Sequence, residues 1–256
     1  MRIEGATALI TGGASGLGEA AARRLLDLGA RRVAIIDMNA EKGRALEASL
    51  DRVLYVQADV SDEKAASDAV EDIAGRCGRL DILINAAAIG GPAKLLSKKG
   101  PMSMALFDRV LKVNLYGPIH IMRAAAPHMV SNEADGDGER GVIINVSSGA
   151  AWEGQVGQIA YSASKAALVG LTFPLMRELA AYGIRVVAVA PGAFDTPIYD
   201  GAPPELKQSL IAQALFPKRM GRAEEFAMFI EEIVRNPMHN GRAYRLDAGM
   251  ILPAFP

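Results

Sequence analysis

The sequence contains almost no cysteine: Cys77 is the single thiol in 256 residues. One thiol excludes an intrachain disulfide framework and fits a reducing compartment. No histidine or asparagine arrangement typical of a catalytic thiol surrounds it, so we expect Cys77 to be structural. We also expect no metal site.

An excess of charge of one sign is also missing, because 28 basic and 29 acidic residues are mixed along the chain. This balance argues against a nucleic-acid surface or an acidic tail. No apolar stretch is expected to reach the roughly 18 residues needed to span a membrane. The first residues, MRIEGATALITGG, lead straight into glycines and do not resemble a secretory signal. We therefore expect a soluble, cytoplasmic protein without membrane or nucleic-acid partners.

What the sequence does contain is apolar residues, which make up 50% of the chain and occur in short runs between helical patterns. Continuous apolar strands between helices indicate a parallel sheet covered on both faces. We predict one α/β domain over 1–256, a Rossmann-type doubly wound fold with ligands at the carboxyl ends of its strands. Strands are expected at 7–11, 32–37, 53–59, 80–88, 141–148, 184–192 and 243–249. Helices are expected at 19–28, 41–50, 62–76 (capped by Ser61), 107–130, 161–183 and 223–236.

Two segments leave this alternating pattern. One spans about 90–103 and carries Lys94, Lys98 and Lys99, and the other spans 194–217. Both follow predicted strands, so we expect them beside the substrate at the functional edge of the sheet. A third, polar segment at 131–140 is expected to be a loop.

The stretch TGGASGLG, Thr11 to Gly18, follows the first strand and opens the first helix. Glycines there permit a tight turn and a close approach to a pyrophosphate, which the free N–H groups of the helix start would bind. The loop residues expected to contact a dinucleotide are Gly12, Ser15, Gly16, Leu17 and Gly18.

An acid, Asp37, ends the second strand 19 residues after Gly18. A carboxylate there can accept both ribose hydroxyls of NAD and would repel the 2′-phosphate of NADP. Neither Ser15 nor Met38 is basic, as NADP binding would favour. The alternative role for Asp37 is an N-cap of the next helix. We predict NAD as the cofactor.

The pentapeptide YSASK places Tyr161 and Lys165 four residues apart, on one face of a helix. An isolated pair of this kind is common on amphipathic helices. The functional interpretation is that the ammonium lowers the pKa of the phenol, which then acts as a general acid or base.

Further motifs decide between these interpretations. They are Asp59-Val60 after the third strand, NAAA at 85–88, VN at 113–114, SS at 147–148, and PG at 191–192 with Thr196. With the glycine loop and Y-x-x-x-K, they span essentially the whole chain. Together they resemble the short-chain dehydrogenase/reductase family, which implies hydride transfer between a nicotinamide cofactor and a secondary alcohol or ketone.

The resemblance implies a role for each matching catalytic position. Tyr161 corresponds to the acid/base, and Lys165 to the lysine that lowers the tyrosine pKa and binds the nicotinamide ribose. Ser148 lies 13 residues before Tyr161, the family's spacing, so it is preferred to Ser147 as the serine that binds the reacting oxygen. Asn114 corresponds to the residue that holds a water in a proton relay.

The resemblance also implies further cofactor contacts. Besides Tyr161 and Lys165, the expected set comprises Asp59, Val60, Asn85, Pro191, Gly192 and Thr196. The alternative role of Asp59 is that of a helix-entry residue only. Ala88 stands where the family usually has glycine. Because glycine allows a closer backbone approach, we expect slight displacement of the cofactor, without loss of binding.

For the substrate, several stretches resemble one subgroup, the type II short-chain 3-hydroxyacyl-CoA dehydrogenases, which also include 17β-hydroxysteroid dehydrogenase activities. They are residues 141–165, the stretch FPKRMGRAEEFA, and the long loop with SKKG. The resemblance implies an (S)-3-hydroxyacyl-CoA/3-oxoacyl-CoA substrate, as in fatty acid metabolism, contacted by Ser148, Gln155 and Tyr161.

The three lysines of the 90–103 loop could then bind the phosphates of coenzyme A, or could only be solvated. Candidates for an apolar channel, or alternatively for core packing, are Trp152, Ile159, Phe194 and Leu215.

Other functions stay open at this stage. They are an NAD-dependent alcohol, polyol or hydroxysteroid dehydrogenase, a 3-oxoacyl-carrier-protein reductase, and a non-catalytic nucleotide-binding scaffold. The carrier-protein reductases are usually NADPH-linked, so Asp37 argues against them. The complete set of Asn114, Ser148, Tyr161 and Lys165 argues against a scaffold. The two long helices resemble those that build homotetramers in the family.

Overall fold

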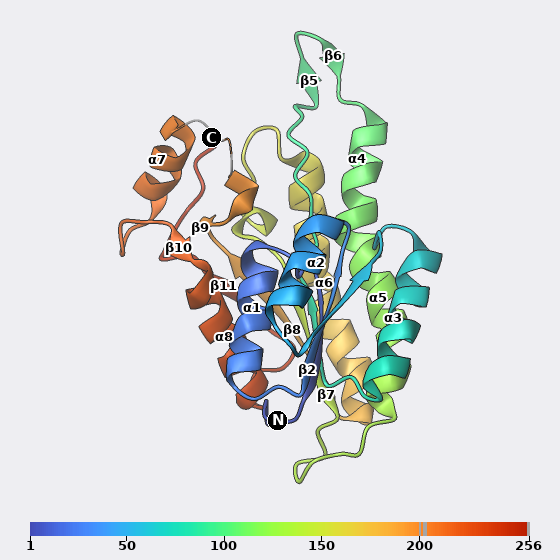
Figure 1. The fold of residues 1–256 in the computed structure, drawn as a ribbon. Coiled ribbons are helices and arrows are strands. Elements are labelled where there is room, and N and C mark those ends of the chain that lie inside the picture. Colours follow the sequence, from blue (N-terminus) through green and yellow to red (C-terminus); the bar gives the residue numbers. More distant parts are fainter. Residues whose placement is uncertain (200, 202–203, 255–256) are drawn as a thin grey trace.

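The computed structural model describes residues 1–199, 201 and 204–254. Its centre is a seven-stranded parallel sheet with strand order β11-β8-β7-β4-β1-β2-β3. The strands are β1 (Thr7–Thr11), β2 (Arg32–Asp37), β3 (Val53–Gln57), β4 (Ile82–Asn85), β7 (Gly141–Val146), β8 (Ile184–Pro191) and β11 (Ala243–Leu246). The predicted doubly wound α/β fold is therefore confirmed (Figure 1).

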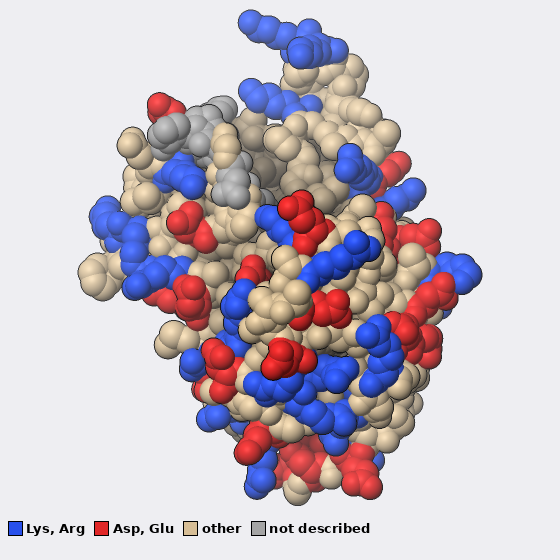
Figure 2. Space-filling view, in the orientation of Figure 1, with Lys and Arg blue, Asp and Glu red and all other residues tan. Residues whose placement is uncertain are grey.

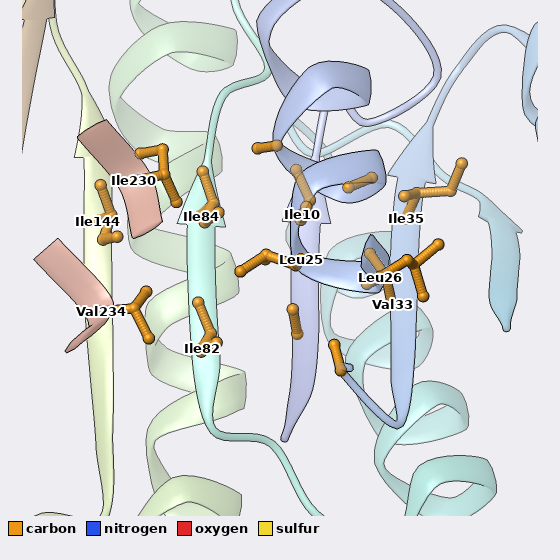
Figure 3. Packing of buried hydrophobic residues seen from close by; sticks show 14 of the residues in the cluster. Ile10, Leu25, Leu26, Val33, Ile35, Ile82, Ile84, Ile144, Ile230 and Val234 are labelled. Atoms are coloured by element: carbon orange, nitrogen blue, oxygen red, sulfur yellow. The ribbon is translucent and has the colours of Figure 1, made fainter. Parts of the chain in front are cut away.

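Helices cover both faces of the sheet. One face packs against α1 (Gly16–Asp27), α2 (Ala40–Ser49) and α8 (Ala223–Arg235). The other packs against α3 (Glu63–Cys77), α5 (Gly117–Val130) and α6 (Ile159–Leu179). Figure 3 shows the first core, where Ile10 and Ile84 of the sheet lie near Leu25 of α1 and Ile230 of α8.

Side chains of each strand point alternately to the two faces of the sheet, which explains why the strands are apolar throughout. In β2, Val33 and Ile35 belong to the first core, whereas Ala34 and Ile36 belong to the second. Successive strand residues point to opposite faces, so a strand buried on both sides needs an apolar residue at every position.

The order of the strands reverses direction beside β1, which pairs with β2 on one side and with β4 on the other. In doubly wound sheets, the loops at the carboxyl ends of the strands separate at this point and leave a crevice for ligands. This topology places the glycine loop, the residues after β4 and the residues after β7 around one crevice.

Several element boundaries differ from expectation. The N-cap of α3 is Asp62, whose side chain accepts from the Ala65 N–H, and not Ser61. The helix expected at 107–130 consists of α4 (Met104–Leu111), one π-helical turn (Lys112–Tyr116) and α5. A π-helical turn inside a helix often marks a functional position.

The two irregular segments contain structure of their own. Residues 90–103 include a hairpin formed by β5 (Leu96–Ser97) and β6 (Gly100–Pro101), which projects from the molecule (Figure 1). Residues 194–217 include β9 (Phe194–Asp195), a 3₁₀ turn (Pro197–Tyr199) and α7 (Pro204–Gln213), and β9 pairs with β10 (Gly221–Arg222). Residues 131–140 include a turn in which Asp135 accepts from the Asp137 and Glu139 N–H groups.

One helical stretch, Ile159–Tyr182, is long and apolar enough to cross a membrane by length and composition alone. Its mean hydropathy is 1.2 over an 18-residue window, of which 28% is buried. The expectation that no such stretch exists is therefore wrong. The reason is that α6 packs one face on β8 and also carries apolar residues on its outer face.

Candidate active site

A cavity of about 920 Å³ lies at the carboxyl ends of the strands, where the topology predicts a ligand site. Its lining includes the glycine loop, the ends of β2, β7 and β8, the start of α6 and the turn after β11. Most predicted site residues line it: Gly12, Ser15, Gly16, Leu17, Gly18, Asp37, Asp59, Val60, Ser148, Gln155, Tyr161, Lys165, Pro191, Gly192 and Thr196. Residues far apart in the sequence thus meet around one space.

The glycine loop packs so tightly that a side chain would meet backbone atoms at Gly12 and at Gly18. A Cβ on Gly12, where φ is +66°, would lie 2.8 Å from the Ala87 Cα. A Cβ on Gly18 would lie 2.3 Å from the Gly12 carbonyl oxygen. The backbone at the start of α1 therefore lines the cavity directly, which fits a pyrophosphate held by N–H groups.

Asp37 ends β2 and lines the cavity. Its carboxylate accepts from the Ala14 N–H at 3.1 Å and the Asn39 N–H at 2.9 Å. The N-cap of α2 is Asn39, whose side chain accepts from the Lys42 N–H. The alternative role of Asp37 as a helix N-cap is therefore wrong, and its carboxylate fits the ribose end of a dinucleotide.

Asp59 has a comparable position after β3. Its side chain accepts from the Ser61 N–H at 2.8 Å and so stabilises the turn that enters α3. It also lines the cavity beside Val60. The helix-entry role and a cofactor contact are thus compatible.

Asn85 and Asn114 do not line the cavity. Asn85 is buried and donates to the Asn145 side chain of the neighbouring strand at 2.9 Å. Asn114, in the π-helical turn, accepts from the Ile89 N–H at 2.8 Å, and donates to the Ile89 carbonyl at 2.9 Å and to Ser164 Oγ at 3.2 Å. Asn85 therefore ties β4 to β7, and Asn114 fixes the backbone beyond β4 against α6.

Tyr161 and Lys165 lie one turn apart at the start of α6, and both line the cavity. Lys165 is 2% exposed, and its ammonium donates to the Val146 carbonyl at 2.7 Å. Burial lowers the pKa of Lys165 from 10.5 to about 8, because the charged form loses its hydration.

Burial also raises the pKa of Tyr161 above its usual value of 10. A hydrogen bond with Ser148 opposes this increase, and the nearby Tyr199 adds to it. In the protein alone, desolvation of the phenol therefore outweighs the Ser148 hydrogen bond, and the lowering of the Tyr161 pKa by Lys165 and an oxidised nicotinamide stays a prediction.

The structure separates the two candidate serines. Ser147 is buried, and its hydroxyl donates to the Lys165 carbonyl at 2.8 Å. Ser148 accepts from the Ala150 N–H at 3.2 Å and hydrogen-bonds Tyr161. Ser148 is thus the serine beside the phenol, and Ser147 attaches β7 to α6.

Gln155 lines the same cavity as Ser148, Tyr161 and Lys165. Its backbone N–H donates to the Gln158 side chain at 3.1 Å, and its side-chain oxygen accepts from Gln158 Nε2 at 3.2 Å. Gln155 lines the cavity, and this pairing uses its side-chain oxygen and leaves its NH₂ available as a donor.

Several cavity residues are missing from the sequence-based prediction. Tyr199 comes from the segment after β8, and Arg245, Asp247, Met250 and Leu252 come from the end of the chain. No local motif marks them, because their role depends on the tertiary path of the last residues. Phe194, Leu210, Met250 and Leu252 form one side of the cavity, which we call the apolar wall.

The predicted apolar channel is only partly correct. Phe194 is buried and lines the cavity. Trp152, Ile159 and Leu215 are exposed and lie outside the cavity lining. Their apolar character is therefore not used in the cavity, and the apolar wall takes most of its side chains from later in the sequence.

The hairpin lysines also lie outside the cavity lining. Lys94, Lys98 and Lys99 are exposed, and Figure 2 shows basic side chains on the projecting hairpin, above a hollow bordered mainly by uncharged residues. The Ala93 N–H donates to the Gly157 carbonyl at 2.8 Å, so the base of the hairpin is attached beside Gln155 and Gln158.

Ala88 lines the cavity with an ordinary backbone conformation, since Ala248 is the one non-glycine residue of the described chain with positive φ. In the part of the chain that the structure describes, no group of three metal-ligating acids, histidines or cysteines occurs.

Comparison with known proteins agrees with this fold and site. Residues 6–206 match the model of the short chain dehydrogenase family. The chain belongs to the short-chain dehydrogenase/reductase family, and it is an oxidoreductase that uses a nicotinamide cofactor.

Individual relatives are similar over nearly their full length. The chain is 43% identical over 251 residues to 3-hydroxyacyl-CoA dehydrogenase type-2 of Homo sapiens, covering 97% of this chain and 96% of that protein. The protein of the same name from Drosophila melanogaster is 40% identical, with 97% and 98% covered. The crystal structure of 3-hydroxyacyl-CoA dehydrogenase type-2 from Mycobacterium avium superposes with a TM-score of 0.92 at 36% identity, covering 99% of each chain.

Proposed function

We propose that this protein catalyses NAD-dependent interconversion of (S)-3-hydroxyacyl-CoA and 3-oxoacyl-CoA. The observation that carries the proposal is that Tyr161, Ser148, Lys165 and Gln155 line one cavity that also has an apolar wall. The polar group suits a hydroxyl or ketone oxygen, and the apolar wall suits an acyl chain. The names of the similar proteins support the same substrate class.

Proton transfer in this proposal belongs to Tyr161. Ser148 donates a hydrogen bond to the substrate oxygen and orients it toward the phenol, since both side chains line the same part of the cavity. Tyr161 donates its proton during ketone reduction and accepts one during alcohol oxidation. A bound nicotinamide supplies or accepts the hydride.

Lys165 has a supporting role. Its ammonium is fixed by the Val146 carbonyl and lies 5.7 Å from the centre of the Tyr161 ring. There it can bind the nicotinamide ribose and stabilise the phenolate by its charge. Asn114 acts indirectly, by holding the Ile89 backbone and the α6 helix in register.

We infer that the cofactor is NAD rather than NADP. Asp37 lies where the adenosine ribose is expected, and its carboxylate would repel a 2′-phosphate. The glycine loop lines the cavity at the start of α1, which suits the pyrophosphate, and Asp59, Val60, Pro191, Gly192 and Thr196 suit the two ends of the dinucleotide.

We infer that the projecting hairpin recognises the coenzyme A part of the substrate. The hairpin that carries Lys94, Lys98 and Lys99 is attached at its base to the cavity-lining Gly157 through Ala93, and ammonium groups bind phosphates well. An alcohol or steroid substrate would use the same Tyr161 and Ser148 but would gain nothing from the lysines.

The test measures NADH oxidation with acetoacetyl-CoA beside a free cyclic ketone, and repeats both with Lys98→Gln/Lys99→Gln. We expect a raised KM for acetoacetyl-CoA and an unchanged KM for the ketone. The matched control is Lys42→Gln/Lys64→Gln, which removes two exposed lysines on α2 and α3. Turnover of the ketone without turnover of the thioester would replace this function by that of an alcohol or hydroxysteroid dehydrogenase.

We also infer a homotetramer, because α6 has an apolar outer face. Ile159 and Phe173 of α6 are 40% and 39% exposed, and Tyr116 beside α5 is 53% exposed. Association of copies would remove this surface from water. Light scattering on the purified protein tests this, and a monomer at micromolar concentration would contradict it.

A further inference from the structure

Arg245, at the end of β11, connects three separate parts of the chain. Its guanidinium donates to both oxygens of Glu153, at 2.6 and 3.1 Å. It also donates to Asp247 Oδ2 at 2.5 Å and to the Met250 carbonyl at 2.7 Å. Glu153 follows β7, whereas Asp247 and Met250 belong to the turn after β11. One side chain therefore joins the loop that carries Gln155 to the end of the chain.

The turn that Arg245 holds has an unusual backbone conformation. Ala248 and Gly249 both have positive φ, at 54° and 70°, and Ala248 is the one non-glycine residue of the described chain that does. A side chain disfavours this region by about 1 kcal/mol or more. Hydrogen bonds from the Met250 N–H to the Asp247 carbonyl and from the Gly249 N–H to Asp247 Oδ1 keep the turn closed.

The turn determines where part of the apolar wall lies. Met250 is 3% exposed and packs with Leu210 and Met220 in a small core separate from the two large ones. The Ala248 carbonyl accepts from the Leu215 N–H at 3.2 Å, at the end of the segment that contains α7. The position of the turn thus fixes Met250 directly and the α7 segment through the backbone.

A backbone hydrogen bond also joins the loop after β7 to the end of the chain. The Val156 N–H donates to the Ala254 carbonyl at 2.8 Å, close to the end of the described chain. Trp152, the single tryptophan, has its ring 5.8 Å from the Arg245 guanidinium carbon. Arg245 therefore makes the multiple contacts that hold the loop after β7 and the final turn together.

We propose that Arg245 is a positioning residue that sets the acyl-chain selectivity of the enzyme, because it holds the Met250 and Leu210 part of the apolar wall against the Tyr161 side of the cavity. This inference rests on the proposed function, since it assumes that the wall contacts an acyl chain. Arg245 itself takes no part in the proton transfer. Lysine cannot replace it fully, because a single ammonium lacks the guanidinium geometry that contacts Glu153, Asp247 and Met250 together.

The experiment compares the wild type with Arg245→Met, Arg245→Lys and Glu153→Gln. Steady-state kinetics are measured with 3-oxoacyl-CoA substrates of four to ten carbons and with the corresponding ethyl 3-oxoalkanoates. For Arg245→Met we expect kcat/KM for the longest chain, relative to the shortest, to change by about tenfold, with most of the change in KM. Arg245→Lys should restore part of the wild-type ratio, and Glu153→Gln should change it in the same direction as Arg245→Met but less.

Two further readouts separate selectivity from general damage. The dissociation constant of NADH, followed by energy transfer from Trp152, should stay within about twofold of the wild type if the cofactor side is intact. The control is Arg24→Met, which breaks an ion pair between α1 and Glu231 of α8 (2.5 Å) whose members lie outside the cavity lining. It should lower Tm without changing the chain-length ratio.

An unchanged ratio in Arg245→Met and Glu153→Gln, accompanied by a lower Tm, would overturn the proposal and leave Arg245 with a structural role only. If the wild type reduces the esters and not the thioesters, the proposed acyl-CoA function fails. The role of Arg245 is then tested with the ester series, by kcat/KM for the longest ester relative to the shortest.

Discussion

The Lys165 ammonium lies 5.7 Å from the centre of the Tyr161 ring and hydrogen-bonds the Val146 carbonyl. The two side chains are one helical turn apart, yet the ammonium is attached to the strand end. Its position is thereby fixed independently of the phenol. Both groups are desolvated, so the pKa of Lys165 falls to about 8 whereas that of Tyr161 rises.

Replacement of Lys165 by methionine should abolish activity but stabilise the fold at neutral pH. The folded protein holds a buried ammonium whose pKa is about 8 instead of 10.5. This difference corresponds to about 3 kcal/mol, reduced by roughly 1 kcal/mol for the unpaired Val146 carbonyl. Urea unfolding of both proteins measures the difference in free energy of unfolding.

The pH dependence of that difference provides the control. Between about pH 8 and pH 10.5, the unfolded wild type binds a proton that the folded wild type has released. Wild-type stability therefore gains relative to the variant as pH rises through this window. A difference that is constant from pH 7 to pH 10 would show that the burial of the charge is not its origin.

Replacement of Ser148 by alanine should move the pH profile of alcohol oxidation to higher pH. Oxidation needs the Tyr161 phenolate, and the hydrogen bond with Ser148 lowers the pKa of this phenol. Without it, kcat/KM should reach its plateau at a higher pH and be about 100-fold lower at neutral pH.

Ketone reduction serves as the internal comparison for Ser148→Ala. It needs the protonated phenol, so its rate should stay independent of pH across the neutral range in both proteins.

In Tyr161→Phe, both directions should lose activity by about 10³-fold or more while NADH still binds. Activity of Tyr161→Phe near the wild-type level would exclude the phenol as the acid/base.

Replacement of Asp37 by serine should weaken the preference for NADH over NADPH by about 10-fold or more, because the carboxylate that repels a 2′-phosphate is gone. Serine keeps one acceptor for the Ala14 or Asn39 N–H groups. The ratio of kcat/KM for the two cofactors is the measurement. Asp51→Ser, an exposed site between α2 and β3, should leave that ratio unchanged.

Replacement of Gly18 by alanine should weaken NADH binding by about tenfold or more and lower Tm. The new Cβ would lie 2.3 Å from the Gly12 carbonyl oxygen, so the cofactor loop must shift. The matched control is Gly75→Ala in α3, where the new Cβ would meet nothing within 4 Å beyond its own stretch of helix backbone. This helical substitution should raise stability by about 0.5–1 kcal/mol. Equal NADH affinity in Gly18→Ala and the wild type would contradict the tight-loop explanation.

The sequence determined most of the scaffold and of the polar site. Apolar runs buried on both faces predicted the parallel strands, because only a covered parallel sheet requires them. The glycine loop, Asp37, Ser148, Tyr161 and Lys165 were predicted because each lies at a strand end or helix start, where local pattern and function coincide. These residues line the cavity as expected.

The tertiary structure alone decided which of the predicted polar residues line the cavity and which are hydrogen-bonded within the protein behind it. Asn85 and Asn114 carry the right residue type at motif positions, but their hydrogen bonds go to Asn145 and to the Ile89 backbone. Spacing along the chain cannot tell a side chain that faces a ligand from one that braces the strand beneath it.

The tertiary structure also decided the apolar wall and the net pKa shift of Tyr161. Met250 and Arg245 reach the cavity because β11 lies at the sheet edge beside β8 and the chain then turns back over the strand ends. Desolvation depends on everything that packs around a group. The position of Lys165 in the sequence therefore could not predict the net direction of the Tyr161 pKa shift. Local patterns predict elements and motifs, whereas long-range packing determines cavity shape and electrostatics.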